Sequence, residues 1–236
     1  MNEQATPVVR RALVAGGTGL VGSELLRLLN QDARYSRVTS LGRRIVEDTG
    51  KIENLVVSFD DLERYELPAV DDAFCCLGTT RRTAGSDEAF RHVDFDYVLS
   101  YARAAKRAGA VRFLLVSSIG ANAQSKLLYT RVKGEAEAGV QAIGFPMVGI
   151  VRPSFLVGRR AEKRSGEAAA IAIGRLAGPL MLGPLRRYRP IDAGVVAGAL
   201  VCLATTAADG VRVLSSQDID AACEHAGATT LASARS

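Results

Sequence analysis

Histidine and cysteine are scarce in this chain of 236 residues, which contains two histidines and four cysteines. The histidines, His92 and His225, are too few and too far apart for a metal site or a Ser-His-Asp triad, and no G-x-S-x-G string occurs. The cysteines show neither the spacing of a disulfide framework nor a C-x-x-C metal pattern. We therefore expect no metal centre and no hydrolase, and a reducing cytoplasm is the simplest expected location.

Long apolar runs are missing as well. The longest, residues 193–205, is too short to cross a bilayer, and residues 1–11 contain charges but no apolar segment of the kind found in signal peptides. Lys and Arg number 30 against 25 Asp and Glu, and the resulting charge of +5 is smaller than is usual in dedicated nucleic-acid-binding proteins. We expect a soluble protein without a nucleic-acid partner and without integral membrane association.

Length and composition favour one folded domain. The chain is 48% hydrophobic and 23% charged, with 23 Gly and 7 Pro, which is ordinary for a globular protein. It shows no internal repeat and no low-complexity linker. We expect a single domain over residues 1–236, in which about residues 153–236 contribute a smaller lobe.

Apolar runs bounded by polar residues or glycine predict buried strands. They are Ala12–Ala15, Val38–Leu41, Leu55–Val57, Ala73–Leu77, Val111–Val116, Met147–Val151 and Val211–Leu214. Helical spacing and capping residues predict the helices Ser23–Gln31, Ser86–Ala108, Leu127–Ile143, Ser165–Ala177, Asp192–Ala208 and Gln217–Ala226, followed by a fraying tail. Strands that alternate with helices predict an α/β fold with a doubly wound parallel sheet.

A glycine-rich turn joins the first strand to the first helix. It consists of Gly16, Gly17, Thr18, Gly19, Leu20, Val21 and Gly22. Glycines at this spacing allow a tight turn, the close approach of a pyrophosphate and tight packing of the helix, whose free N–H groups then face the anion. The motif predicts a dinucleotide site, so we expect the single domain to be an NAD(P)-binding Rossmann domain with its smaller lobe on the substrate side. Such turns also occur as plain connections between a strand and a helix.

The end of the second strand indicates which dinucleotide binds. NAD-binding sites usually place an acidic residue there, whereas this chain has Arg43 and Arg44, whose guanidinium groups suit a 2′-phosphate. We therefore predict NADP(H) rather than NAD(H), the alternative being a solvated basic loop. Asp60, just past the third strand, is a candidate acceptor for the adenine amino group, or else an exposed loop residue.

Tyr129 and Lys133 form the single Y-x-x-x-K string of the chain. Residues four apart share one face of a helix, so the phenol and the ammonium can point into the same pocket. A cation beside a phenol favours the phenolate and makes the phenol a better proton donor, and the lysine can also hold the nicotinamide ribose. Without supporting features this pair would be a chance surface pairing.

Two serines provide such a feature. Ser117 and Ser118 end the predicted strand Val111–Val116, and ligands of open parallel sheets bind beyond the carboxyl ends of the strands. Ser118 is the candidate donor to a substrate oxygen on which charge develops, with Ser117 as the alternative that the sequence does not separate from it.

These motifs together resemble the short-chain dehydrogenase/reductase superfamily in its atypical or extended branches. Over about residues 11–155 the chain is similar to the HIV Tat-interactive protein family of NADPH-binding oxidoreductases. The strings that carry this similarity are Leu41-Gly-Arg-Arg44, Phe74-Cys-Cys-Leu-Gly-Thr-Thr80, Val93-Asp-x-Asp-Tyr97, Ser117-Ser-x-Gly-Ala121, Tyr129-x-x-Val-Lys-Gly-Glu135 and Arg152-Pro153.

The resemblance implies roles for individual residues. It implies Tyr129 as general acid/base, Lys133 as its partner, and Arg43 and Arg44 on the 2′-phosphate. The other implied cofactor-binding residues are Gly16, Gly17, Thr18, Gly19, Leu20, Val21, Gly22, Leu77, Gly78, Thr79, Ser117, Lys133, Arg152 and Pro153. Where many members of the superfamily have an Asn-rich or Ala-rich turn after the fourth strand, this chain has Cys76-Leu-Gly-Thr79, so a proton relay through an Asn of that turn is not expected.

The expected function is that of an NADPH-dependent reductase acting on a small molecule with a carbonyl group. The alternatives are a nucleotide-sugar epimerase or dehydratase, and an NADPH sensor or scaffold with a protein partner. A homodimer is a further candidate assembly. A basic cluster precedes the predicted Asp192 helix and is interpreted as a solvated face or as a site for an acidic substrate or partner; it comprises Arg159, Arg160, Lys163, Arg164, Arg175, Arg186, Arg187 and Arg189.

Overall fold

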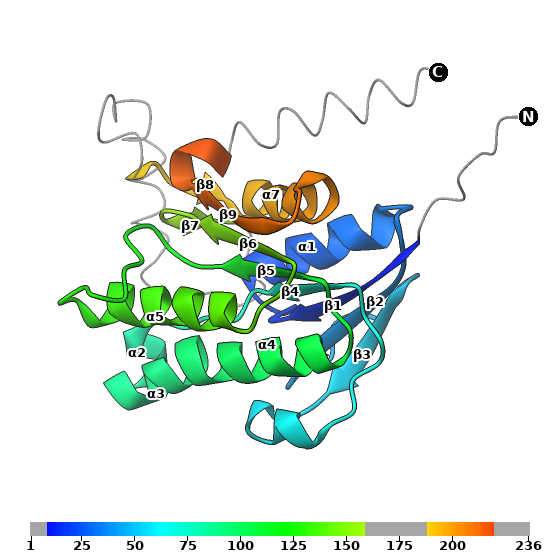
Figure 1. Cartoon of the computed structure of the whole chain (residues 1–236), viewed down its shortest axis with the longest axis horizontal. Coiled ribbons are helices and arrows are strands. Elements are labelled where there is room, and N and C mark those ends of the chain that lie inside the picture. Colours follow the sequence, from blue (N-terminus) through cyan, green and yellow to red (C-terminus); the bar gives the residue numbers. More distant parts are fainter. Residues whose placement is uncertain (1–8, 159–187, 220–236) are drawn as a thin grey trace, which may run out of the picture.

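The computed structural model describes residues 9–158 and 188–219 (Figure 1). In this part of the chain, parallel strands form a seven-stranded sheet in the order β3-β2-β1-β4-β5-β6-β9. The strands are β1 Arg10–Ala15, β2 Tyr35–Gly42, β3 Ile52–Val56, β4 Asp72–Cys75, β5 Arg112–Val116, β6 Met147–Arg152 and β9 Gly210–Ser215. A separate short pair joins β7 (Leu156–Val157) to β8 (Ile191–Asp192).

Helices cover both faces of the large sheet (Figure 1). On one face lie α1 (Leu20–Gln31) and α7 (Ala193–Thr206), and on the other lie α4 (Tyr97–Arg107) and α5 (Leu128–Ala142). Shorter elements lie on the side of α4 and α5: the 3-10 helix η1 (Phe59–Arg64), α2 (Arg81–Ala84), α3 (Asp87–Arg91) and the π-helical turn η2 (His92–Asp96). This arrangement confirms the predicted doubly wound α/β fold.

The alternation of side chains along β1 explains why both faces need a cover. Ala12 and Val14 belong to the apolar cluster under α1 and α7, whereas Leu13 and Ala15 belong to the cluster under α4 and α5. All four are fully buried. A strand that is apolar on both faces is stable only in the interior of a sheet that is covered on both sides.

The predicted strands are present, with shifted ends. Pairing of Arg10 with Tyr35 starts β2 at Tyr35, three residues before the predicted Val38. The strand predicted over Ala73–Leu77 stops at Cys75, so the interpretation of Cys76 as a strand residue is wrong. The carbonyl oxygen of Cys76 would lie only 2.5 Å from a Cβ atom on Gly16, so the two loops meet here and the chain turns out of the sheet.

The helix predicted over Ser86–Ala108 is interrupted. Ser86 does cap its start by accepting from the Ala89 N–H at 3.1 Å, but α3 passes into the π-helical turn η2 before α4 begins. The cap predicted at Asp192 is also present, because its carboxylate accepts from the Gly194 N–H at 2.8 Å. The elements η1 and α2 were not predicted.

Some predictions lie outside the described residues. They are the helix Ser165–Ala177, most of the helix Gln217–Ala226, the tail after it, and the basic cluster except for Arg189.

A buried carboxylate ties the amino ends of four strands together. Asp72 at the start of β4 is fully buried and accepts from the Tyr35 hydroxyl at 2.7 Å and from Arg112 at 3.0 Å, and Arg10 lies 3.4 Å away. Burial, followed by the charge of Asp72, raises the pKa of Tyr35 well above its usual value. A buried carboxylate with three donors is stable only while all the partners remain.

We predict that Asp72→Ala lowers the free energy of unfolding by about 3 to 5 kcal/mol, because it leaves the charges of Arg10 and Arg112 without their buried partner. Urea-induced unfolding measures the loss. The matched control is Asp71→Ala, because Asp71 pairs with Arg11 but its side chain is 32% exposed. This control should cost about 1 kcal/mol. Equal losses for the two variants would contradict the prediction.

Candidate active site

The glycine-rich turn is shaped by close contacts within the protein. Gly16 has φ +83, which L side chains rarely adopt. A Cβ atom on Gly22 would lie 2.1 Å from the carbonyl oxygen of Gly16, so α1 reaches the turn only because residue 22 has no side chain. The Gly19 N–H donates to the same carbonyl at 3.0 Å and closes the turn.

Gly19 differs from its two neighbours in the motif. A Cβ atom there would meet only the Gly16 carbonyl oxygen, at 3.2 Å, so packing within the protein explains little of the need for glycine. Gly19 is also the N-cap residue of α1, where no side chain caps the helix and the first turn has no acidic residue. The start of α1 therefore suits an anion such as a pyrophosphate, and a bare backbone at Gly19 suits its close approach.

The predicted arginines lie at the carboxyl end of β2. Both Arg43 and Arg44 are exposed. The Arg44 guanidinium donates to the Thr18 hydroxyl of the glycine-rich turn at 3.2 Å. The structure thus brings a cation of the second strand to the anion-binding turn after the first strand, as expected for a site that binds a phosphorylated ribose.

The predicted catalytic pair, Tyr129 and Lys133, lies on the first turns of α5. Tyr129 is 38% exposed, and its ring stacks on Phe90 of α3 with a centroid separation of 5.5 Å. Lys133 is buried, and its Nζ lies 2.7 Å from Oδ1 of Asp94. Burial opposes the charged form of this lysine, but Asp94 and Tyr129 outweigh that effect and raise the pKa of Lys133. At neutral pH the lysine is therefore charged, one helical turn from the phenol.

Asp94 is a site residue that we did not predict. It is fully buried in the π-helical turn η2, and its Oδ2 accepts from the Thr79 N–H at 2.8 Å. The sequence does contain a signal, because Phe90, Asp94 and Val98 follow one another at four-residue spacing. A single carboxylate in an otherwise apolar helical stripe indicates a buried partner of opposite charge.

The loop after β4 lies over this ion pair. Leu77, Gly78 and Thr79 were predicted beside the cofactor, and Gly78 is exposed. A Cβ atom on Gly78 would lie 3.4 Å from both Asp94 Oδ1 and Lys133 Nζ. The buried ion pair therefore lies directly beneath an exposed glycine.

Ser117 and Ser118 follow β5, as predicted, and are 5% and 7% exposed. Neither hydroxyl oxygen has a hydrogen-bond partner among the described residues. Buried hydroxyl groups nearly always have partners, so these two fit a ligand that supplies them. The choice between Ser117 and Ser118 stays open.

The loop after the two serines is held against α5. The Asn122 N–H donates to the Thr130 carbonyl oxygen at 2.9 Å, and a Cβ atom on Gly134 would lie 2.2 Å from the Ala123 nitrogen. The serines and the Tyr129–Lys133 face are thus joined by a loop that packs on α5 itself.

Arg152 and Pro153 lie at the carboxyl end of β6, where the Pro153 carbonyl oxygen accepts from the Ile119 N–H at 2.8 Å. The Arg152 guanidinium binds both carboxylate oxygens of the buried Glu137, with its Nε 2.9 Å from Oε1. The bond to Glu137 raises the pKa of Arg152. This pair ties β6 to α5 one turn beyond Lys133, and a contact of Arg152 with the cofactor stays a prediction.

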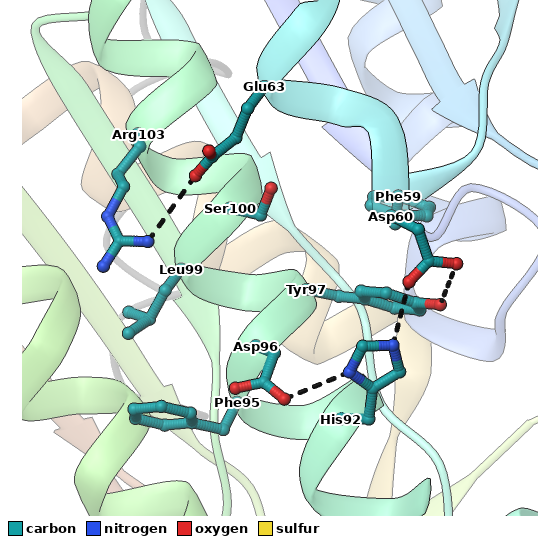
Figure 2. A pocket seen from close by; sticks show the side chains of 10 residues that line it. All are labelled: Phe59, Asp60, Glu63, His92, Phe95, Asp96, Tyr97, Leu99, Ser100 and Arg103. Atoms are coloured by element: carbon teal, nitrogen blue, oxygen red, sulfur yellow. Dashed lines mark hydrogen bonds and ion pairs between the residues drawn. The ribbon is translucent and has the colours of Figure 1, made fainter.

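Asp60, the predicted acceptor for adenine, lines a surface groove of about 280 Å³ between η1 and α4 (Figure 2). Its two oxygens are bound by His92, whose Nε2 is 2.9 Å away, and by the Tyr97 hydroxyl at 3.0 Å. The other His92 nitrogen lies 3.1 Å from Asp96. Figure 2 shows this chain of side chains along one wall of the groove. Binding of adenine by Asp60 stays a prediction.

Comparison with known proteins identifies the family of this chain. The model of the family described as "NAD dependent epimerase/dehydratase family" matches residues 12–191. Protein HTATIP2 of Rattus norvegicus is 41% identical over 165 residues, covering 67% of this chain and 67% of that protein. "Protein FMP52-1, mitochondrial" of Scheffersomyces stipitis is 39% identical over 174 residues, covering 70% and 75%. The resemblance inferred from the motifs is confirmed.

Solved structures share the fold at low identity. MoeE5 in complex with UDP-glucose and NAD is 18% identical with a TM-score of 0.66, covering 92% of this chain and 82% of that chain. Human epimerase family protein SDR39U1 with NADPH is 19% identical with a TM-score of 0.61, covering 87% and 74%.

The predicted cytoplasmic location is contradicted. The relatives from Scheffersomyces stipitis, Debaryomyces hansenii, Coccidioides immitis and Candida albicans are all named as mitochondrial proteins. Free cysteines fit any reducing compartment, so cysteine usage could not separate the two locations. Within the described residues, no helix has both the length and the hydropathy needed to span a bilayer.

We predict that Gly22→Ala mainly lowers stability, whereas Gly19→Ala mainly weakens cofactor binding. Gly22→Ala forces a methyl group against the Gly16 carbonyl and should lower the free energy of unfolding by about 3 kcal/mol. Gly19→Ala should cost about 1 kcal/mol or less. It should nevertheless weaken NADPH binding about tenfold, which corresponds to about 1.4 kcal/mol. Urea unfolding and fluorescence titration with NADPH measure the two effects, and unchanged NADPH affinity in Gly19→Ala would refute the role of this turn.

The hydrogen bonds between His92 and the carboxylates of the groove predict that the stability of the protein depends on pH. The bonds to Asp96 and then to Asp60 raise the pKa of His92 in the folded protein. Protonated His92 therefore stabilises the fold fully at pH values below its unfolded pKa, and this stabilisation is lost as the pH rises through the folded pKa. The His92 bond lowers the pKa of Asp60, whose contribution is lost as pH falls through the folded value. His92→Gln should therefore destabilise the protein more at about pH 5 than at about pH 8. Unfolding midpoints at the two pH values test this, and an equal loss at both would contradict it.

Proposed function

Because this chain belongs to the NAD dependent epimerase/dehydratase family, we propose that it is an NADP(H)-dependent oxidoreductase that reduces the carbonyl group of a small molecule. The observation that carries the proposal is a buried, charged Lys133 one helical turn from Tyr129 on α5. The loop that packs on this helix follows Ser117 and Ser118, whose buried hydroxyls have no partner among the described residues. Burying a cation costs desolvation free energy. Buried titratable groups of this kind, here one turn from an exposed phenol, cluster at functional sites.

The residues of the carboxyl edge fit NADP(H). The glycine-rich turn and the free start of α1 would hold the pyrophosphate, and Arg43 and Arg44 would hold the 2′-phosphate. Leu77, Gly78 and Thr79 would line the cofactor beside the catalytic pair. The arginines are the reason to propose NADP(H) over NAD(H), since similar folds are known with either cofactor. When bound, the cofactor supplies a hydride for the carbonyl carbon.

The protein's own residues supply the proton and the electrostatics. The Tyr129 hydroxyl donates its proton to the carbonyl oxygen, and the Lys133 ammonium stabilises the phenolate that remains. Ser118, or Ser117 in its place, donates a hydrogen bond to the same oxygen as negative charge develops on it. The stack on Phe90 fixes the plane of the Tyr129 ring. Within the predicted lobe of about residues 153–236, α7 and β9 belong to the main sheet and its cover, so the remaining part of this region would select the substrate.

A second candidate is an epimerase or dehydratase acting on a nucleotide sugar. The family description and the UDP-glucose in the structure of MoeE5 favour it. The same Tyr129 and Lys133 would move a proton in both directions during oxidation and re-reduction of one sugar carbon. A sugar nucleotide that co-purifies with the protein would support this candidate over the reductase.

We predict that purified protein oxidises NADPH in the presence of some members of a panel of aldehydes, ketones and quinones, and does so faster than it oxidises NADH. Tyr129→Phe should lower kcat by about 10² to 10⁴-fold, because the proton donor is lost. Tyr65→Phe is the matched control, since Tyr65 is an exposed residue at the end of η1 and should keep full turnover.

Full turnover by Tyr129→Phe would overturn the assignment of the proton donor. Tight NADPH binding without turnover of any panel member would instead favour an NADPH sensor whose partner binding depends on the cofactor.

A further inference from the structure

The buried carboxylate of Asp94 connects two parts of the site. Its Oδ1 lies 2.7 Å from the Lys133 ammonium of α5, and its Oδ2 accepts from the Thr79 N–H of the loop after β4 at 2.8 Å. Asp94 is fully buried, and the side chain of Lys133 is 8% exposed. One carboxylate therefore binds both the catalytic cation and a loop beside the cofactor.

The π-helical turn η2 explains how a helix residue reaches both partners. A π turn contains one more residue per turn than an α-helix and so redirects the side chains within it. In η2, Asp94 points inward, whereas His92 and Asp96 lie in the outer groove and bind each other (Figure 2). Arg91, just before the turn, pairs with Glu135 of α5. This pair gives the segment a second tie to α5, before the Asp94 contact.

The surroundings of Lys133 leave its charge dependent on Asp94. The titratable groups that act on Lys133 are Asp94 from η2, Tyr129 from its own helix and Cys75 from β4. Burial raises the pKa of Cys75 to about 12, so this thiol is neutral at working pH. A buried ammonium without a facing carboxylate loses its proton more readily than a free lysine.

We propose that Asp94 is a positioning residue of the active site, which keeps Lys133 charged and fixes its ammonium between Tyr129 and the Thr79 loop. The part of this proposal that concerns proton donation rests on the proposed function, whereas the part that concerns the charge of Lys133 does not. The proposal adds a residue on a different element to the Tyr129–Lys133 pair and gives the π-helical turn its purpose.

The test compares Asp94→Asn with the matched control Asp96→Asn. Asn at position 94 keeps an oxygen for the Thr79 N–H but removes the negative charge. Asp96 lies two residues away in the same turn, with its side chain 51% exposed and bound to His92. A general disturbance of η2 would affect both variants, whereas loss of the Lys133 partner affects one.

The charge of Lys133 is measured directly. The chain has five lysines, so NMR of protein labelled at lysine Cε and Nζ gives few signals, and Lys133→Met identifies the relevant one. We expect the Lys133 signal to titrate above 10.5 in the native chain and in Asp96→Asn, and below 10.5 in Asp94→Asn. An unchanged titration in Asp94→Asn overturns the proposal.

The pH dependence of turnover tests the functional part. Above the lowered pKa of Lys133, kcat of Asp94→Asn should fall about tenfold per pH unit as the charged fraction falls, while Asp96→Asn keeps the native profile. A lowered Lys133 pKa with an unchanged kcat profile overturns the functional part. No turnover by the native chain, together with the expected NMR result, refutes the proposed function and upholds the role of Asp94 in holding the charge.

A second variant covers the case in which Asp94→Asn does not fold. Adding Lys133→Met removes the uncompensated cation and should restore the urea midpoint, since replacing both members of a buried ion pair costs far less than removing one. Failure of Lys133→Met to restore stability overturns the proposal, because the loss would then not come from the cation.

Discussion

The reversal of strand order between β1 and β4 is the constraint on which the rest of the site depends. The chain builds β1, β2 and β3 outward in one direction and then returns to place β4 on the other side of β1. The loops after β1 and β4 therefore leave the sheet toward opposite faces, and they touch where Gly16 meets the carbonyl oxygen of Cys76. Ligands of open parallel sheets bind at such a divide. The glycine-rich turn after β1 and the loop of Leu77, Gly78 and Thr79 after β4 lie on its two sides.

The two edges of the sheet use buried charge differently. At the amino edge, Asp72 has Tyr35, Arg10 and Arg112 around it, all from neighbouring strands, and this cluster stabilises the sheet. At the carboxyl edge, Asp94 binds a lysine from a helix and an N–H from a loop. The same edge carries the hydroxyls of Ser117 and Ser118, which have no partner among the described residues. Buried polar groups without partners mark a place for a ligand, whereas the Asp72 cluster, bound on all sides, fits a structural role.

The sequence predicted the parts of the molecule that depend on local patterns. Apolar runs identified the strands because a sheet covered on both faces leaves no polar alternation, as Leu13 and Val14 show. The four-residue spacing of Tyr129 and Lys133 placed both on one face of α5. Asp94 escaped prediction although it stands between Phe90 and Val98 at helical spacing, because its partners, Lys133 and Thr79, come from other elements that the sequence alone does not place beside it. The partners of Asp60 could not be predicted either, because His92 and Tyr97 reach it from 32 and 37 positions away.

The π-helical turn also determines how the side chains of α3 are oriented relative to those of α4. Each residue of an α-helix advances the direction of the side chains by about 100°. The π turn absorbs one residue more than an α-helical turn, so α3 and α4 stay nearly in phase on either side of it. Loss of one residue from His92–Asp96 would leave a regular α-helix, in which Phe90 could still stack against Tyr129 but the side chains of the turn itself would be redirected. The extra residue therefore sets where the buried carboxylate points without moving the aromatic support of the phenol.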